Sequence, residues 1–269
     1  MKMNWKQSTF LAAAMALGWS AFAASAHAAD WGAYQVEDRR SGYTYMTDQT
    51  RAIQNDNFQN PGMLWVEQGA DLWSKVDGKA EKSCASCHGA TGESMKGVAA
   101  RYPVYDQNLG KMQNVEQQIN HCLETRMEAS PYKWESGEML SMTTFISNQS
   151  LGMPVNVSIE GPAAEAFEKG KAFYEQRRGQ LDLACKQCHD EFPGGIIRAN
   201  TLSQGQGNGF PTYRLKWQKV GSLHRRFRGC NSMVRATPYG YGSDEYTNLE
   251  LYVKWRGRGL PVETPAVRN

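Results

Sequence analysis

The chain has 269 residues, a formal net charge of +3, 41% hydrophobic residues and six cysteines. This composition excludes a disordered or low-complexity chain, because the aromatic and aliphatic residues suffice for a packed core, and the length allows one large domain or two of ordinary size. Net charge identifies no class of partner, because loss of a predicted signal peptide with two lysines would leave a charge near +1.

Residues 1–28 are predicted to be a secretory signal peptide. Lys2 and Lys6 precede an apolar stretch from Phe10 to Ala24, and Ala26-His27-Ala28 supplies a small-residue cleavage site. The apolar stretch is too short to span a membrane comfortably, and we expect no membrane span after signal cleavage. The mature protein is therefore expected in the periplasm, a compartment that permits disulfides.

Two C-x-x-C-H motifs predict two covalently bound haem c groups. Each motif offers two thiols for thioether bonds and a following histidine as the proximal iron ligand. The thioether residues are Cys84 and Cys87, then Cys185 and Cys188, and the proximal ligands are His88 and His189. A zinc half-site or a thioredoxin-like redox pair is the alternative, but two copies in an exported chain, each followed by His, favour haem.

Two further cysteines, Cys122 and Cys230, lie at matching places after the two motifs. We expect each to ligate a haem iron as a thiolate, which favours ferric iron and a low potential. A disulfide between them is the alternative that an exported protein permits. Met153 competes as a ligand in the first half, whereas its counterpart Leu260 cannot ligate iron.

The chain contains an internal duplication. Glu67–Trp73 resembles Glu168–Tyr174, and the offset between these segments is the same as that between the two C-x-x-C-H motifs. A downstream set, which includes Gly152–Val155 and Gly259–Val262, repeats at a second, slightly longer offset. Two registers of matches indicate two units built on one plan.

We therefore predict a mainly α fold with two duplicated cytochrome c-like haem domains and an N-terminal extension. The predicted bounds are 29–60 for the extension, 61–157 for the first haem domain, and 158–269 for the second, which carries the active site. Apolar spacing and capping signals predict helices at Glu67–Val76, Gly137–Asn148, Ala163–Arg177 and Ser243–Trp255. The segments between the motifs and the later cysteines are rich in Gly, Asn and Gln and are predicted to be loops. Aromatic residues of the extension fit core packing or a partner's surface.

Residues Phe192 to Ser243 contain no Asp or Glu but eight basic residues. These are Arg198, Arg214, Lys216, Lys219, Arg225, Arg226, Arg228 and Arg235. Pairing with haem propionates is the simpler explanation, but it does not explain why the first half lacks such a cluster. A small anionic substrate near Cys230 does, because arginine presents a rigid fork of donors to oxyanions. Nucleic acid is not expected as a partner, given the export signal and the lack of interleaved aromatic residues.

The order of these motifs resembles the dihaem SoxA subunit of the thiosulfate-oxidising Sox system. The similarity spans about residues 60–265, and its most specific part is the basic run from His224 through Cys230 to Asn231. The resemblance implies an L-cysteine S-thiosulfotransferase that joins thiosulfate to a cysteine of the carrier SoxYZ. It further implies SoxX, a monohaem cytochrome, as a partner, and a cytochrome c as electron acceptor. Cys230 would be both an iron ligand and the catalytic persulfide, and Arg226 the catalytic arginine.

Two other functions stay open. A thiosulfate dehydrogenase, which couples two thiosulfates to tetrathionate, is also a dihaem protein with a cysteine-ligated haem. A plain dihaem electron carrier is the alternative that is not an enzyme. Leu260 and the matched pair Cys122 and Cys230 favour the SoxA interpretation over thiosulfate dehydrogenase.

Overall fold

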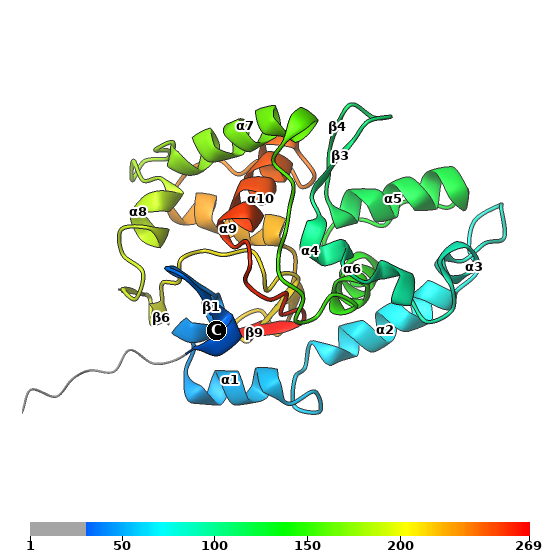
Figure 1. Cartoon of the computed structure of the whole chain (residues 1–269), viewed down its shortest axis with the longest axis horizontal. Helices are drawn as coiled ribbons and strands as arrows, with labels where there is room; N and C mark the ends of the chain where they lie inside the picture. The colour runs from blue at the N-terminus through cyan, green and yellow to red at the C-terminus, as the bar shows by residue number, and fades with distance from the viewer. Residues whose placement is uncertain (1–30) are drawn as a thin grey trace, which may run out of the picture. The chain divides into compact units, whose positions relative to one another are not determined.

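Helices dominate residues 31–269, the part of the chain that the computed structural model describes (Figure 1). The α-helices are α1 (Asp48–Asn55), α2 (Met63–Ser74), α3 (Cys84–His88), α4 (Val98–Arg101), α5 (Val115–Arg126), α6 (Gly137–Asn148), α7 (Ala164–Glu175), α8 (Cys185–His189), α9 (Leu223–Met233) and α10 (Asp244–Arg256). Short 3-10 helices lie at Gly32–Tyr34, Gly42–Tyr45, Glu93–Met95 and Gly161–Ala163. The prediction of a mainly α fold is confirmed.

The strands have two or three residues each and form small sheets. They are β1 (Gln35–Val36), β2 (Arg39–Arg40), β3 (Val104–Asp106), β4 (Lys111–Gln113), β5 (Ile196–Ile197), β6 (Asn200–Thr201), β7 (Thr212–Arg214), β8 (Lys219–Gly221) and β9 (Ala266–Arg268). β7 pairs antiparallel with β8 and parallel with β9. Within residues 31–269 no helix has the length and hydropathy needed to cross a membrane. The predicted signal peptide, residues 1–28, lies outside the described residues.

The four predicted helices are confirmed, with bounds that shift by a few residues. Helix α6 has the predicted bounds, whereas α2 begins one turn earlier than predicted. Ser136 and Ser243 cap α6 and α10, since each side chain accepts a hydrogen bond from a backbone N–H of the first turn. The loop prediction is wrong in part, because α5 and α9 each begin two turns before Cys122 and Cys230. The many polar residues of α5 and α9 obscure the apolar periodicity by which a helix is recognised in a sequence.

The same packing occurs in both halves of the chain. Helix α2 packs against α6, and α7 packs against α10. At the first crossing a Cβ on Gly69 would overlap the carbonyl oxygen of Ser141, and at the second a Cβ on Gly170 would overlap that of Asn248. Gly170 follows Gly69 by the first offset that the sequence repeats, and Asn248 follows Ser141 by the second. The hairpin of β3 and β4 likewise recurs in the second half as β7 and β8.

The segments that end the two halves pair with each other. Gly152–Val155 runs antiparallel to Gly259–Val262, through an isolated bridge between Pro154 and Pro261. The four hydrogen bonds, donor first, are Val155 to Leu260 at 2.9 Å, and Val262 to Met153, Gly152 to Val262 and Gly259 to Val155 at 2.8 Å. When each residue is replaced by its equivalent in the other half, every one of these four bonds becomes another of the four. The pairing therefore has an approximate two-fold symmetry.

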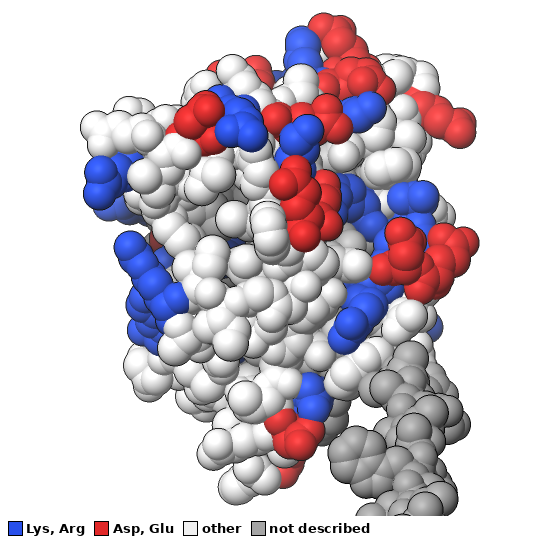
Figure 2. Space-filling view, turned by 90° about the vertical axis from the view of Figure 1, so that its left-hand side faces the viewer, with Lys and Arg blue, Asp and Glu red and all other residues white. Residues whose placement is uncertain are grey.

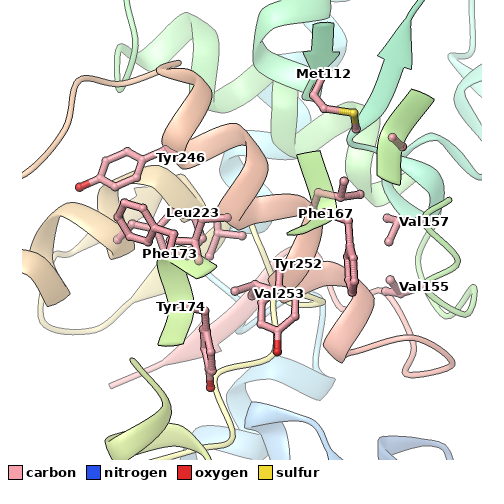
Figure 3. Close-up of a cluster of buried hydrophobic side chains, with 14 of the residues drawn as sticks. Met112, Val155, Val157, Phe167, Phe173, Tyr174, Leu223, Tyr246, Tyr252 and Val253 are labelled. Atoms are coloured by element: carbon pink, nitrogen blue, oxygen red, sulfur yellow. The ribbon is translucent and has the colours of Figure 1, made fainter. Parts of the chain in front are cut away.

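The largest hydrophobic cluster draws on both halves. Figure 3 shows Met112 of β4, with Val155 and Val157 of the connecting segment, beside Phe167 of α7 and Tyr252 of α10. A second cluster around Trp73, Leu123 and Met142 lies within the first half. Part of the apolar surface of the first half is therefore buried by the second half.

The segment before α2 packs on the C-terminal segment. The side-chain amide of Asn60 donates to the carbonyl oxygen of Pro265 at 2.8 Å, and that of Gln54 donates to the carboxylate of Glu263 at 3.1 Å. Its aromatic residues contact other residues of the chain: the rings of Tyr34 and Tyr43 stack with centroids 3.9 Å apart. Trp65, at the start of α2, packs edge-on against Tyr213 of β7.

We predict that Gly170→Ala destabilises the protein by about 1–3 kcal/mol, because the added methyl group has no space between α7 and α10. Thermal unfolding followed by circular dichroism measures the change. Gly137→Ala is the matched control, since no heavy atom lies within 4 Å of its added Cβ. Equal melting temperatures for Gly170→Ala and Gly137→Ala would contradict the close approach of the two helices.

Candidate functional site

A cavity of about 560 Å³ lies between α8 and α9. It is lined by Cys185, Cys188 and His189 of α8 and by Cys230 of α9. The structure thus brings together all four residues predicted for the second haem. The volume falls within the range typical of ligand and cofactor pockets, about 300–1,000 Å³.

His189 is oriented as a metal-ligating histidine would be. Its Nδ1 lies 2.7 Å from the carbonyl oxygen of Ser203, which makes Nδ1 the protonated nitrogen and leaves the lone pair of Nε2 to interact with Cys230. Gly205 covers the ring: its φ is +71°, and a Cβ there would overlap the imidazole. The loop after α8 therefore fixes both the tautomer and the position of His189.

The end of α8 is also fixed to neighbouring helices. The hydroxyl of Tyr174, on α7, donates to the carboxylate of Asp190 at 2.7 Å, and Arg256 of α10 pairs with the same carboxylate. In the first half the indole N–H of Trp73, the counterpart of Tyr174, donates to the carbonyl oxygen of Gly89 at 2.8 Å. Each motif is thus anchored by an aromatic side chain of the preceding helix.

The thiol of Cys230 differs in its electrostatics from the other thiols of the cavity. Burial alone would raise its pKa, but Arg226, His189 and Arg214 together lower the pKa of Cys230 to about 7. Burial and the neighbouring Cys230 instead raise the pKa of Cys185 to about 12. Cys230 is therefore the thiol of this cavity that is most readily ionised near neutral pH.

The lining of the cavity is cationic. Its basic side chains are Arg178, Arg198, Arg214, Lys216, Arg226, Arg235 and Arg268, and no Asp or Glu of residues 31–269 lines it. Figure 2 shows the side of the molecule that carries α8 and β6, with basic side chains along its left edge and most acidic ones at the top and right. Burial, with Arg226 as the next cause, lowers the pKa of Arg214 to about 10, which leaves it charged at neutral pH. Such a cavity concentrates small anions.

Five of the eight basic residues singled out from the sequence line the cavity, and three do not. Arg225 lies 3.4 Å from the carboxylate of Glu135 and stacks over Trp217, while Arg228 lies over the ring of Tyr241. Lys219 belongs to β8, away from the lining. Arg225 and Arg228 therefore do not lie beside Arg226 in the cavity lining, whereas Arg214 of β7 does.

Two basic residues of the lining were missed. Arg178 follows α7 and lies over the ring of Phe173, and Arg268 belongs to β9, in register with Arg214 of β7. Both lie outside the acid-free stretch of the sequence. The parallel pairing of β9 with β7 has no local signal, because it joins segments that lie far apart in the chain.

The residues predicted for the first haem gather on α3 and α5. Burial raises the pKa of Cys84 to about 11, and the thiol of Cys122 adds to this rise. The two thiols therefore lie near each other. The side-chain amide of Gln118 donates to the sulfur of Cys122 at 3.3 Å. Cys87 and His88 are exposed, and the ring of His88 lies 5.8 Å from that of Trp73. The cluster is more open to solvent than the cavity of Cys230.

Of the two candidate distal ligands in the first half, the geometry favours Cys122. Met153 packs with the hydrophobic cluster shared by the two halves, whereas Cys84 packs with the separate cluster around Trp73. Cys122 and Cys230 belong to different sites, each near the thiols of its own motif. Two thiols, a histidine whose Nε2 carries its lone pair and an ionisable thiol around one cavity fit a covalently bound haem c.

Comparisons with known proteins agree with these features. Residues 68–155 match the family model for the SoxA/TsdA cytochrome c domain. The L-cysteine S-thiosulfotransferase subunit SoxA of Rhodovulum sulfidophilum is 46% identical over 91% of this chain and 84% of its own length. The protein of the same name from Pseudaminobacter salicylatoxidans is 49% identical over 88% of this chain and 83% of its own. The crystal structure of SoxXA from P. pantotrophus superposes with a TM-score of 0.83 at 45% identity, covering 86% of this chain and 87% of that one.

We predict that Gly205→Ala perturbs iron ligation at the second motif, because its methyl group displaces the ring of His189. Haem stays attached through the thioethers, but the low-spin EPR signal of that iron weakens or splits. Gly194→Ala is the control: Gly194 also has a positive φ, +92°, yet no heavy atom lies within 4 Å of its added Cβ. An unchanged EPR spectrum in Gly205→Ala would show that this glycine does not position the histidine.

Proposed function

Because this chain belongs to the SoxA family of L-cysteine S-thiosulfotransferase subunits, we propose that it joins thiosulfate to a cysteine thiol of a SoxYZ carrier. The reaction converts a thiol R–SH and thiosulfate into R–S–S–SO₃⁻, in which the thiol sulfur is bonded to the outer sulfur of thiosulfate, with release of two electrons and one proton. The observation that carries the proposal is the cavity in which Cys230 lies among basic side chains with no acidic residue of the described chain in the lining.

The cytochrome c domain implies covalently bound haem c, and we propose two such groups, one in each half. Cys185 and Cys188 would hold the second haem covalently, with His189 and Cys230 as its iron ligands. Cys84 and Cys87 would hold the first, with His88 and Cys122 as ligands. Haem bound in these sites would accept the electrons that formation of the S–S bond releases. The repeated helix pairs and hairpins support the two duplicated haem domains, with the bounds 61–157 and 158–269.

Arg226 is proposed to bind the sulfonate end of thiosulfate. It lies one helical turn before Cys230 on α9, so both side chains share one face of the helix and both line the cavity. Charge-assisted hydrogen bonds from Arg226, with Arg214 on the neighbouring strand, would neutralise the dianion. The outer sulfur of thiosulfate is then held beside the thiolate of Cys230, which the same arginines stabilise in its ionised form.

The match to the SoxXA complex supports a SoxX subunit as the partner. We further propose the periplasm as the location, in keeping with the signal predicted for residues 1–28, and a cytochrome c as the final electron acceptor. Tetrathionate formation from two thiosulfates is the weaker alternative, because the relatives at 45–49% identity are SoxA subunits.

We predict that Arg226→Ala lowers kcat/KM for thiosulfate by about 10²-fold, because one charged donor to the reacting anion is lost. Steady-state reduction of an acceptor cytochrome c, with thiosulfate and the reduced carrier, measures the rate. Arg225→Ala is the matched control, since the adjacent Arg225 pairs with Glu135 outside the cavity. An unchanged rate in Arg226→Ala would refute the role of Arg226. Tetrathionate formed from thiosulfate without carrier would refute the carrier-dependent reaction.

Two haem c groups are expected in the intact mass of the purified protein. Denaturing mass spectrometry of Cys84→Ala with Cys87→Ala should show the loss of one haem, and Cys185→Ala with Cys188→Ala the loss of the other, because each pair holds one haem through its thioethers. A wild-type mass with a single haem would contradict the proposal of two haem-binding halves while leaving the cavity of Cys230 as the active site.

A further inference from the structure

Charged side chains are buried where the two halves meet, outside the cavity of Cys230. Glu116 of α5, together with Glu250 and Lys254 of α10, is 5–7% exposed. Burying charges is costly unless they are paired and hydrogen-bonded, or unless one of them is neutralised by a proton. Neither haem attachment nor thiosulfate binding uses these three residues.

Glu250 is the ionised member of the group. Its carboxylate accepts a hydrogen bond from the side chain of Asn114 at 3.0 Å and lies 3.2 Å from Nε2 of His224. Nδ1 of His224 accepts from the backbone N–H of Gly242 at 3.1 Å, so a ring proton is on Nε2, beside Glu250. Burial would raise the pKa of Glu250, but His224 and Lys254 hold it below its usual value.

Glu116 is the member that carries a proton. Burial and the neighbouring carboxylate of Glu250 raise the pKa of Glu116 to about 8, and Glu135 adds to the effect. Lys254 opposes it, although burial lowers the pKa of Lys254 itself. Two carboxyl groups and one amine thus share a site in which one carboxyl group is protonated at neutral pH.

Three helices and two neighbouring segments supply the titratable groups around this site, whereas the lining residues of α6, Thr143 and Ser147, carry no charge. Helix α5 supplies Glu116, α9 supplies His224, and α10 supplies Glu250 and Lys254. The loop before α6 supplies Glu135, whose charge is balanced by Arg225 at 3.4 Å, and Tyr102 follows α4.

The group lies between the two haem sites. A small cavity of about 20 Å³, room for one water molecule, is lined by Glu116, Glu250 and Lys254. Leu223 and Phe210 line both this cavity and the large one, so one layer of side chains separates the carboxyl groups from the second haem site. On the other side Tyr102 lines the small cavity and interacts electrostatically with Cys122.

We propose that Glu116, Glu250 and Lys254 form a buried proton-binding site whose occupancy is linked to the oxidation state of the haem held beside Cys230. The inference rests on the proposed haem site. Above about pH 8, where Glu116 is ionised while the iron is ferric, the pair would bind one proton from solvent for each electron that this site accepts, and the proton would compensate the added charge. Transfer of the electron to the acceptor releases the proton again. At low dielectric such compensation is strong over one layer of side chains.

Spectroelectrochemical titration of the holoprotein between pH 6 and 10 tests this link. The midpoint potential of the second haem should be nearly constant below about pH 8 and should fall as pH rises above it, with a slope below the limit of about 59 mV per pH unit for one proton per electron. Glu116→Gln should flatten this dependence, whereas Glu165→Gln, an exposed carboxyl on α7 paired with Lys169, should leave it unchanged. A pH dependence that is the same in Glu116→Gln and wild type would overturn the proposal.

Infrared difference spectra of the wild-type protein provide a test that does not depend on folding of a variant. At pH 9, where Glu116 is mostly ionised in the oxidised protein, reduction should add a carboxylic acid C=O band that shifts in D₂O, and its absence would overturn the proposal. Failure of the proposed haem site and failure of the proton site give different results. A protein without haem at Cys185 and Cys188 would refute the haem site, whereas complete haem with a pH-independent potential would refute only the proton site.

Discussion

The pairing of Gly152–Val155 with Gly259–Val262 is the contact on which the rest of the structure depends. Four backbone hydrogen bonds join equivalent segments of the two halves, and the largest hydrophobic cluster forms around them with side chains from both. Because the two halves share this core, α5 and α9 are held on either side of the small cavity. The sites of Cys122 and Cys230 therefore belong to one compact unit.

The two halves share the same arrangement of helices around their cysteines, which we call the shared frame. They differ in the charged residues around Cys122 and Cys230. Each half presents its C-x-x-C-H motif on a five-residue helix and its further cysteine on a longer one. Around Cys230, however, basic residues come from the turn after α7, from β7, β9 and α9, and they surround a large cavity. Around Cys122 the motif is open to solvent. The shared frame suits the haem site proposed for each half, whereas the cationic lining is suited to an anionic substrate in the second half alone.

The sequence was sufficient where the chemistry is local or repeated. The motif and the matched later cysteine identified Cys185, Cys188, His189 and Cys230 of the cavity lining, and apolar spacing with capping signals located four helices. The parallel pairing that brings Arg268 beside Arg214 has no local pattern. The buried charges were missed for another reason: Glu250 and Lys254 have the i,i+4 spacing of an ordinary solvent-exposed ion pair. Only the packing of α5 across α10 reveals that Glu116 shares their site.

The central claim is that Cys230 is both the distal ligand of the second iron and the thiol among the arginines that bind substrate. EPR spectra of the ferric protein test it most directly, with Cys230→Met as the comparison. We predict a low-spin thiolate signal from the second iron that disappears in Cys230→Met, while the signal of the iron near Cys122 persists. A wild-type spectrum with histidine–histidine or histidine–methionine ligation at the second iron would contradict the assignment of Cys230 as its distal ligand.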